Sequence, residues 1–300
     1  MSIVITARTG QIGSRVVARL LESGNAITVV ARDPSKLSAA VRAAATIGAG
    51  SLDDPGVLER ATIGAETLFL LIPPNFSTDD PSGFQLGIAR LAAEAVLRNG
   101  VTCVVLLSSI GAHRSDMAGV SRLGAAEKLF DAVAPNVLSV RPAFFLENLF
   151  SAVPTIVDDG AIYFAFSADQ RGPLIATHDP ADVVAAELLD AEWTGHRVRE
   201  LHGAADRSFA EVAAVVSNAI GKPVHYVTVE RAAVQRALLG AGTSAAIADD
   251  YAVLYTKLAE HFDDHAPRSA ESTTPTTVEQ FVAEVLAPAI ASASAAVGSR

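Results

Sequence analysis

The sequence predicts an α/β fold in which a doubly wound parallel sheet is joined to a small, mostly helical C-terminal cap. Three observations lead to this prediction. Short apolar runs rich in β-branched residues alternate with amphipathic segments in the first half of the chain, as in parallel sheets covered by helices on both faces. The first of these runs leads into a turn with two glycines and then a helical pattern. After residue 150 the alternation loosens and helical patterns dominate.

The first half predicts six strands and four helices. Right-handed crossovers between such strands leave a ligand crevice beyond the carboxyl ends of the strands. The strands are expected at Ile3–Thr6, Ile27–Ala31, Thr46–Ala49, Thr67–Ile72, Thr102–Leu107 and Val137–Val140. The helices are expected near Gln11–Ser23, Pro55–Ala61, Gly83–Asn99 and Ser121–Ala132.

The second half predicts a cap and a return to the sheet. A helix near Ala181–Ala191 and a strand at Arg197–Leu201 are expected to rejoin the sheet. Cap helices are expected at Ser208–Ile220, Glu230–Leu239, Ser244–Phe262 and Thr277–Leu286, with a strand at Val224–Val229. The expected domains are therefore a nucleotide-binding core of residues 1–150 with 178–203, and a cap of residues 151–177 and 204–286. Residues 287–300 are mostly Ala, Ser and Gly, so we expect a frayed, flexible tail.

The composition limits the class of protein. A chain of 300 residues that is 50% hydrophobic and 19% charged has enough apolar residues for a substantial core. Its net charge of −10 gives no basic surface for nucleic acid or an anionic membrane. Cys103 is the one cysteine, which excludes an intramolecular disulfide and favours a reducing compartment. Neither a signal peptide nor a transmembrane segment is recognisable, so we expect a soluble cytoplasmic protein.

The turn after the first strand has the composition of a phosphate-binding loop. Two glycines let the backbone approach a ligand closely, and the positive end of the following helix attracts an anion. A strand before the turn and a helix after it make this a candidate dinucleotide site of the Rossmann type. The expected cofactor-binding residues here are Thr6, Arg8, Thr9, Gly10, Gln11, Ile12 and Gly13.

The end of the second strand indicates which dinucleotide is bound. A carboxylate at this position would hydrogen-bond the ribose of NAD, but the chain has Ala31 followed by Arg32. The guanidinium of Arg32, with Lys36 close behind, suits the additional phosphate of NADP. Taken alone, Arg32 is more simply a solvated loop residue, and its place after the glycine turn is what favours NADP. Asp33, a carboxylate beside the site, leaves binding of an NAD ribose as an alternative. We therefore expect NADP(H) as the preferred cofactor, with NAD(H) as the second choice.

Several stretches together resemble the NmrA-like branch of the atypical short-chain dehydrogenase/reductase superfamily. The resemblance covers roughly residues 2 to 286 and implies an NAD(P)H-binding Rossmann domain with a small C-terminal lobe. It also implies relatives among quinone and dye reductases, isoflavone-type reductases, and redox sensors that bind NADP without turnover. The matching stretches are the Thr-x-x-Thr-Gly-x-x-Gly turn, VVARDPSKL, LFLLIPPN, LLSSIGA, AAEKL, VRPAFFLENL and GKPVHYVTV.

The chain departs from the superfamily pattern in two ways. Ala7 stands where superfamily turns usually begin with glycine, which places a methyl group near the expected phosphate site. None of the four tyrosines is followed by a lysine four residues later. The resemblance therefore implies that the chain lacks the usual Tyr-x-x-x-Lys acid, as is normal in the NmrA-like branch.

Other loops at the expected strand ends supply further candidates, each with a structural alternative. Leu71, Ile72 and Pro73 are expected to line the nicotinamide side, or simply to end a strand. A hydroxyl of Ser108 or Ser109 is expected to touch the nicotinamide ribose, polarise an acceptor or cap a turn. His113 is a weak candidate for a proton donor, with a surface residue as the alternative. The expected substrate contacts are Phe144, Phe145 and Asn148, against core packing for the rings and loop stabilisation for the amide.

These features favour an NADP(H)-dependent oxidoreductase that transfers hydride to a small planar acceptor such as a quinone or dye. The acceptor oxygen would take its proton from water, since no strong protein acid is required. The alternative is a non-catalytic NADP-binding redox sensor that acts through a protein partner. His261 and His265 lack an identifiable third ligand, so no metal site is expected. No direct contact with nucleic acid or membrane is expected, and a homodimer stays open.

Overall fold

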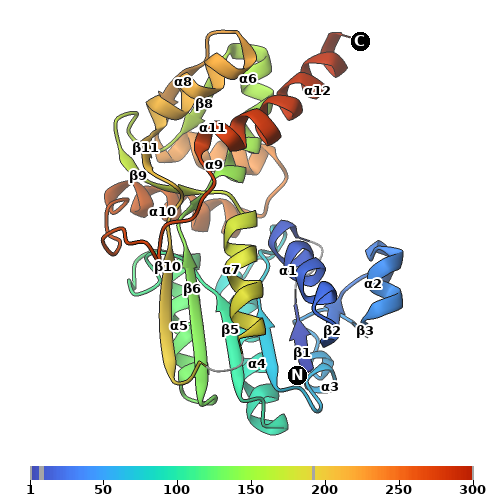
Figure 1. Ribbon diagram of the computed structural model, residues 1–300. Helices are drawn as coiled ribbons and strands as arrows, with labels where there is room; N and C mark the ends of the chain where they lie inside the picture. Colours follow the sequence, from blue (N-terminus) through green and yellow to red (C-terminus); the bar gives the residue numbers. More distant parts are fainter. Residues whose placement is uncertain (1, 7–9, 191–192, 299–300) are drawn as a thin grey trace. The chain divides into compact units, whose positions relative to one another are not determined.

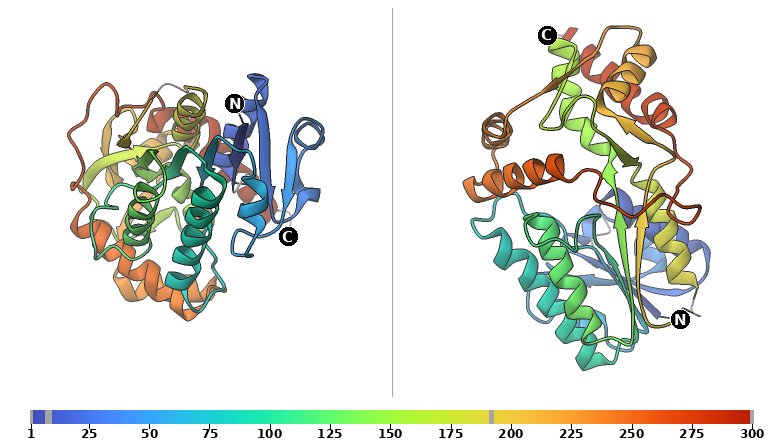
Figure 2. Two further views of the ribbon diagram at one scale, coloured as in Figure 1. Left: turned by 90° about the horizontal axis from the view of Figure 1, so that it is seen from below. Right: turned by 90° about the vertical axis from the view of Figure 1, so that its left-hand side faces the viewer.

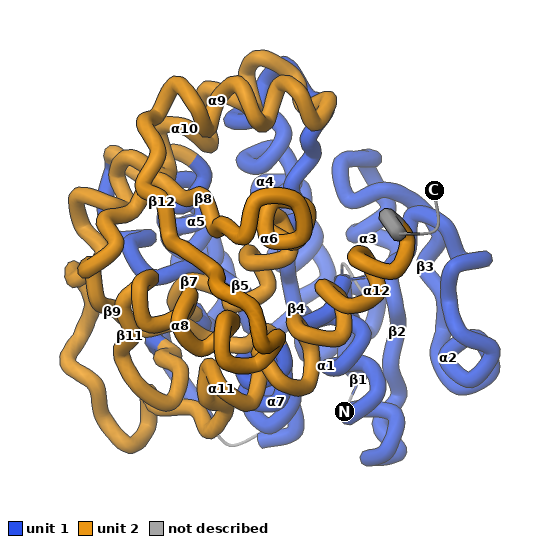
Figure 3. Tube along the Cα trace, turned by 90° about the horizontal axis from the view of Figure 1, so that it is seen from above, with its two compact units in different colours: residues 1–115, 119–141, 178–200 blue, residues 116–118, 142–177, 201–300 orange. Residues whose placement is uncertain are grey.

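The computed structural model describes residues 2–6, 10–190 and 193–298. The chain divides into two compact units, each built from discontinuous segments (Figure 3). Unit 1 comprises Met1–Ser115, Gly119–Arg141 and His178–Glu200. Unit 2 comprises Asp116–Ala118, Pro142–Thr177 and Leu201–Arg300. No helix among the described residues is long and apolar enough to cross a membrane.

Unit 1 is built on a seven-stranded sheet, which confirms the predicted doubly wound architecture (Figure 1). The strand order is β10-β6-β5-β4-β1-β2-β3, and the pairs from β3 to β6 are parallel. The order reverses on either side of β1, so the first strand lies at the topological switch point where such sheets bind ligands. The strands are β1 (Ser2–Ile5), β2 (Ala26–Ala31), β3 (Thr46–Ala49), β4 (Thr67–Leu70), β5 (Cys103–Leu107), β6 (Asn136–Pro142) and β10 (His196–Leu201).

Helices cover both faces of this sheet (Figures 1 and 2). Helix α1 (Gln11–Glu22) packs against α7 (His178–Leu189), whereas α4 (Pro81–Asn99) packs against α3 (Val57–Ala61) and α5 (Gly119–Asp131). The central strands are buried on both faces: Ile3, Leu68 and Val104 each have no exposed surface. A short 3-10 helix (Pro34–Lys36) and α2 (Ala39–Ala44) join β2 to β3.

Unit 2 combines helices with two small sheets. The sheets have the orders β11-β9-β7 and β12-β8. Their strands are β7 (Phe144–Phe145), β8 (Ala161–Phe164), β9 (Arg171–Ile175), β11 (Asp206–Ser208) and β12 (His225–Thr228). The helices are a 3-10 segment (Leu146–Ala152), α6 (Val153–Asp159), α8 (Phe209–Ile220), α9 (Arg231–Gly240), α10 (Ala245–Glu260), α11 (Val278–Phe281), a π-helical turn (Val282–Leu286) and α12 (Ala287–Gly298).

The expected frayed tail is instead a helix. Residues 287–298 form α12, which continues directly from the π-helical turn. Alanine is the best helix former, so a stretch rich in alanine continues a helix once its first turn exists. Leu286 and Ile290 are buried in the core of unit 2 and hold this segment. The prediction of a flexible tail was wrong for the described part because it weighed composition without this packing.

Residues 142–150 also differ from the expected division of the chain. They belong to unit 2 in the structure, whereas the sequence pattern predicts that they are part of the nucleotide-binding core. The reason is that Leu146 and Leu149 are buried in the apolar core of unit 2, with Phe144 packed against it. The sequence pattern shows an apolar segment there but does not show which core that segment joins.

Candidate cofactor-binding site

The carboxyl end of β1 is tied to the end of β4 through Thr6. The Thr6 hydroxyl accepts a hydrogen bond from the Leu71 amide at 2.9 Å and lies 3.3 Å from the carbonyl oxygens of Phe69 and Leu71. Thr6 is fully buried, and Ile72 is nearly so. The predicted residues Thr6 and Leu71–Pro73 therefore lie together at one edge of the sheet, and the Thr6 side chain shapes this edge from within.

The N-terminus of α1 lies at the same edge. Gly10 precedes the helix in an extended conformation and has no side chain to cap it. The first turn contains Gln11, Ile12 and Gly13 and no acidic residue. The helix therefore presents backbone N–H groups and a positive dipole end, as a pyrophosphate requires. Arg8 and Thr9, and Ala7 with its methyl group, lie outside the described residues.

Directly after β2, the cation of Arg32 is exposed, whereas the neighbouring carboxylate of Asp33 already accepts hydrogen bonds. Arg32 is exposed and makes no hydrogen bond or ion pair within the described chain. Asp33 accepts hydrogen bonds from the Ser35 hydroxyl at 2.6 Å and the Ser35 amide at 3.0 Å. These bonds, with the positive charge of Lys36 adding to them, lower the pKa of Asp33 below its ordinary value. This arrangement suits a phosphate at Arg32 better than a ribose hydroxyl at Asp33.

The loop after β5 holds the two candidate serines differently. Ser108 is buried, its amide donates to the Val140 carbonyl at 2.7 Å, and its hydroxyl donates to Glu127 at 2.5 Å. Ser109 is half-buried and its hydroxyl donates to the carbonyl of the next residue at 3.1 Å. His113 is exposed at the end of the same loop. Ser108 is therefore part of the layer between the sheet and α5.

Glu127 and Arg141, which were not among the predicted site residues, hold the loop after β5. The guanidinium of Arg141 donates to both Glu127 oxygens, at 2.9 and 2.5 Å. Both side chains are largely buried, and the hydrogen bond to Glu127 raises the pKa of Arg141. A lone acid on the buried face of a predicted helix and an arginine ending an apolar strand were the available signals, since such charges are buried only in pairs.

The candidate substrate residues lie in unit 2. Phe144 packs into an aromatic cluster, with ring centroids 5.3 Å from Phe166 and 5.9 Å from Phe209. This packing favours the core alternative for Phe144, although its ring is half-buried rather than fully buried. Phe145 and Asn148 are half-buried, and the Asn148 carbonyl accepts a hydrogen bond from Ser151 at 2.7 Å.

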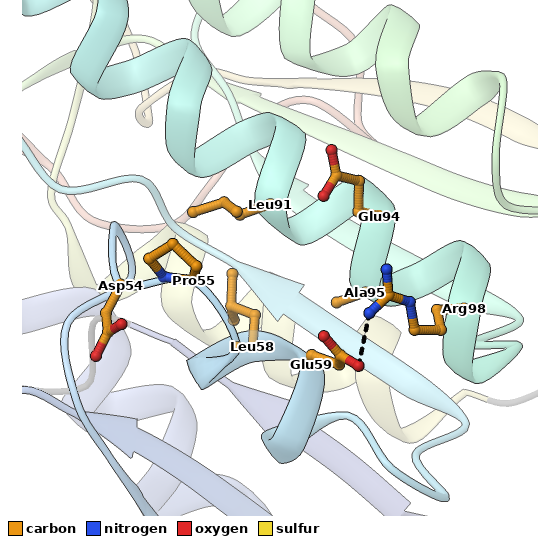
Figure 4. Close-up of a pocket in the computed structure, with 9 residues that line it drawn as sticks. Asp54, Pro55, Leu58, Glu59, Leu91, Glu94, Ala95 and Arg98 are labelled. Atoms are coloured by element: carbon orange, nitrogen blue, oxygen red, sulfur yellow. Dashed lines mark ion pairs between the residues drawn. The ribbon is translucent and has the colours of Figure 1, made fainter.

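A separate hollow lies between α3 and α4 (Figure 4). It has a volume of about 230 Å³, with Leu58, Leu91 and Ala95 on its apolar side and an ion pair between Arg98 and Glu59 at 2.7 Å. The second half of α4 runs toward the amino ends of the strands. This hollow is therefore not part of the candidate cofactor site at the carboxyl ends.

Known proteins with a similar sequence or fold include NAD(P)H-dependent reductases. The model of the NmrA-like family matches residues 1–282. An NAD(P)H azoreductase of Xenophilus azovorans is 27% identical over 84% of this chain and 86% of its own length. Quinone oxidoreductase 2 of Escherichia coli is 26% identical over 82% of this chain and 84% of its own length. The crystal structure of a Citrobacter triphenylmethane reductase complexed with NADP(H) shares the fold, with a TM-score of 0.79 at 20% identity over 93% of this chain and 98% of that one.

Proposed function

The chain belongs to the NmrA-like family, and from this premise we propose that it is an NADP(H)-dependent reductase of small planar acceptors such as quinones or dyes. Relatives named as an azoreductase and a quinone oxidoreductase support reduction of conjugated molecules by a nicotinamide cofactor. The observation that carries the proposal is the exposed Arg32 beside Asp33, whose carboxylate already accepts hydrogen bonds from Ser35.

Different residues at the sheet edge bind different parts of NADP(H). The open N-terminus of α1, with Gly10, binds the pyrophosphate, and Arg32 with Lys36 binds the additional phosphate. Leu71, Ile72 and Pro73 provide an apolar wall for the nicotinamide. When bound, the reduced cofactor supplies the hydride.

The proposed chemistry needs no tyrosine acid. When a hydride adds to a quinone, the electron pair moves onto oxygen and that oxygen takes a proton from water. The protein has to hold the acceptor and exclude bulk water from the reacting carbon. Phe144, Phe145 and Asn148 stay the proposed acceptor contacts, and Ser109 and His113 the proposed polar groups. A cytoplasmic setting is part of the proposal, since reducing conditions suit the single cysteine.

The direct test is oxidation of NADPH by the purified protein with a panel of quinones, azo dyes and triphenylmethane dyes. Loss of the nicotinamide absorbance that depends on the acceptor is the expected result. Binding of NADPH without turnover on any acceptor would reject the reductase.

The second candidate is an NADP-binding redox sensor that acts through a protein partner. The missing Tyr-x-x-x-Lys pair and Ala7 in the turn favour it. Calorimetry with NADPH, NADP+, NADH and NAD+ distinguishes the two candidates. A sensor requires different affinities for the oxidised and reduced forms together with no turnover, because a ligand shifts an equilibrium only by its differential affinity.

A further inference from the structure

Helix α5 contacts the loop after β5 at two positions one turn apart. At Gly124, an added Cβ would lie 1.8 Å from the carbonyl oxygen of Ala112, so only glycine permits this approach without a shift of the backbone. At Glu127, the carboxylate accepts the hydrogen bond from Ser108. Residues three apart lie on the same face of a helix. The loop of residues 108–113 is therefore held at its start and near its end.

The anchor at Glu127 is rigid because the carboxylate is itself held. Arg141 binds both of its oxygens from the end of β6, and the two side chains are only 8% and 12% exposed. A buried ion pair contributes little net stability compared with apolar packing of the same volume. What the pair provides here is a defined orientation for Ser108, whose amide is also bonded to Val140.

The same contacts distinguish the two serine hydroxyls. The Ser108 proton is directed to Glu127, within the layer between the sheet and α5. Ser109 is half-buried, and its hydroxyl bonds only to the neighbouring carbonyl of Ile110 within the described chain. A hydroxyl rotates easily to a better acceptor. Ser109 is thus the residue of this pair that is able to donate a hydrogen bond to a ligand.

We propose that Glu127 and Gly124 are positioning residues that hold Ser109 to donate a hydrogen bond to the acceptor oxygen. This inference rests on the proposed reductase activity. As hydride reaches the acceptor, negative charge gathers on that oxygen, and a fixed donor stabilises it without giving up its own proton. Small displacements of such a donor are costly, since misplacement by about 1 Å lowers rates by up to about 100-fold.

The test compares Glu127→Gln with Glu187→Gln. Glu187 is a matched control, because its side chain is also 8% exposed and forms an ion pair with Arg199 at 2.5 Å. Glu187 lies on α7, which packs against α1 rather than against α4 and α5. Hydrogen exchange is measured for amides 109–113 in both variants. Turnover of NADPH with a quinone is measured for both and for their combinations with Ser109→Ala.

The expected result has two parts. Glu127→Gln speeds exchange across residues 109–113 and lowers kcat by about tenfold or more, whereas Glu187→Gln changes neither. Adding Ser109→Ala to Glu127→Gln lowers kcat little further, because residues that act through one group are not additive.

The contrary results are also distinct. Unchanged exchange in Glu127→Gln overturns the anchor, whatever the activity of the wild type. Faster exchange with fully additive effects on kcat overturns the link to Ser109. A wild type with no turnover rejects the reductase function and with it the donor role, while the exchange data still decide whether Glu127 holds the loop.

Discussion

The carboxylate of Asp33 accepts two hydrogen bonds from Ser35, one from its hydroxyl at 2.6 Å and one from its amide at 3.0 Å. Asp33 thereby caps the 3-10 helix Pro34–Lys36 directly after Arg32. In a turn of this type, an acid that is occupied and a cation that is exposed favour recognition of a phosphate over recognition of a ribose hydroxyl.

Arg32→Ala is expected to weaken NADPH binding about 10- to 100-fold, because a charge-assisted hydrogen bond contributes about 1.5–3 kcal/mol. NADH binding should change less than about threefold. Isothermal titration calorimetry with both cofactors provides the measurement, with the exposed Arg60→Ala as control. Equal losses for the two cofactors would show that Arg32 does not bind the additional phosphate.

Ser35→Ala is expected to shift the preference toward NADH. Loss of the hydroxyl donor raises the pKa of Asp33 toward its ordinary value and leaves its carboxylate available to a ribose hydroxyl. Removing one such hydrogen bond should change the ratio of the two dissociation constants by about threefold to tenfold. Ser38→Ala, which removes the cap of α2 instead, is the control and should leave the ratio unaltered.

Unit 1 is expected to lose stability in acid as Asp182 becomes protonated. Arg15 hydrogen-bonds its two oxygens at 2.7 and 2.6 Å, and together with Arg19 this lowers the pKa of Asp182. A lowered pKa contributes stability above the ordinary aspartate value of about 4, and this contribution is lost as pH falls through the folded value.

Asp182→Asn should therefore cost about 1 kcal/mol or less at neutral pH, since exposed pairs are screened by solvent. The cost should shrink as the pH falls below about 4. Urea unfolding over a pH series measures the difference, with the exposed Asp53→Asn as control. A pH-independent difference would contradict an ionic contribution.

Phe144→Leu is expected mainly to lower stability, with a smaller effect on acceptor binding. The ring makes edge contacts with Phe164, Phe166 and Phe209, and such aromatic pairs contribute about 0.5–1.5 kcal/mol each. Phe145→Leu is the matched variant, and it should raise the KM for the acceptor with a smaller loss of stability. Thermal unfolding and steady-state kinetics separate the two, and a raised KM in Phe144→Leu would support its role in substrate binding.

Ile290→Ala is expected to destabilise unit 2 by about 2–4 kcal/mol, because large-to-small changes in a core remove contacts and leave a cavity. Ile290 is only 4% exposed although it lies in a stretch of small residues. Ser292→Ala on the exposed side of α12 should have little effect on urea unfolding. If both variants unfold like the wild type, α12 does not pack as the structure has it.

The positions of the sheet strands along the chain were predictable because the signals for a strand are local. An apolar β-branched run such as Ile3–Ile5 has to be buried, and the glycine turn that follows dictates a helix. Four strands of unit 2 were missed: β7, β8, β9 and β11, which have two, four, five and three residues. Segments of that length become strands only through partners distant in the sequence.

The candidate site divides in the same way. The sequence by itself determined the α/β class, the candidate phosphate-binding turn and the cation at Arg32, since each is indicated by patterns within short stretches of the chain. Only the tertiary structure decided that Phe144 packs against a core and that Glu127 and Arg141 hold Ser108. These outcomes depend on which side chains meet in space, and a hydrogen bond or a buried contact is formed by one specific partner that residue type alone does not identify.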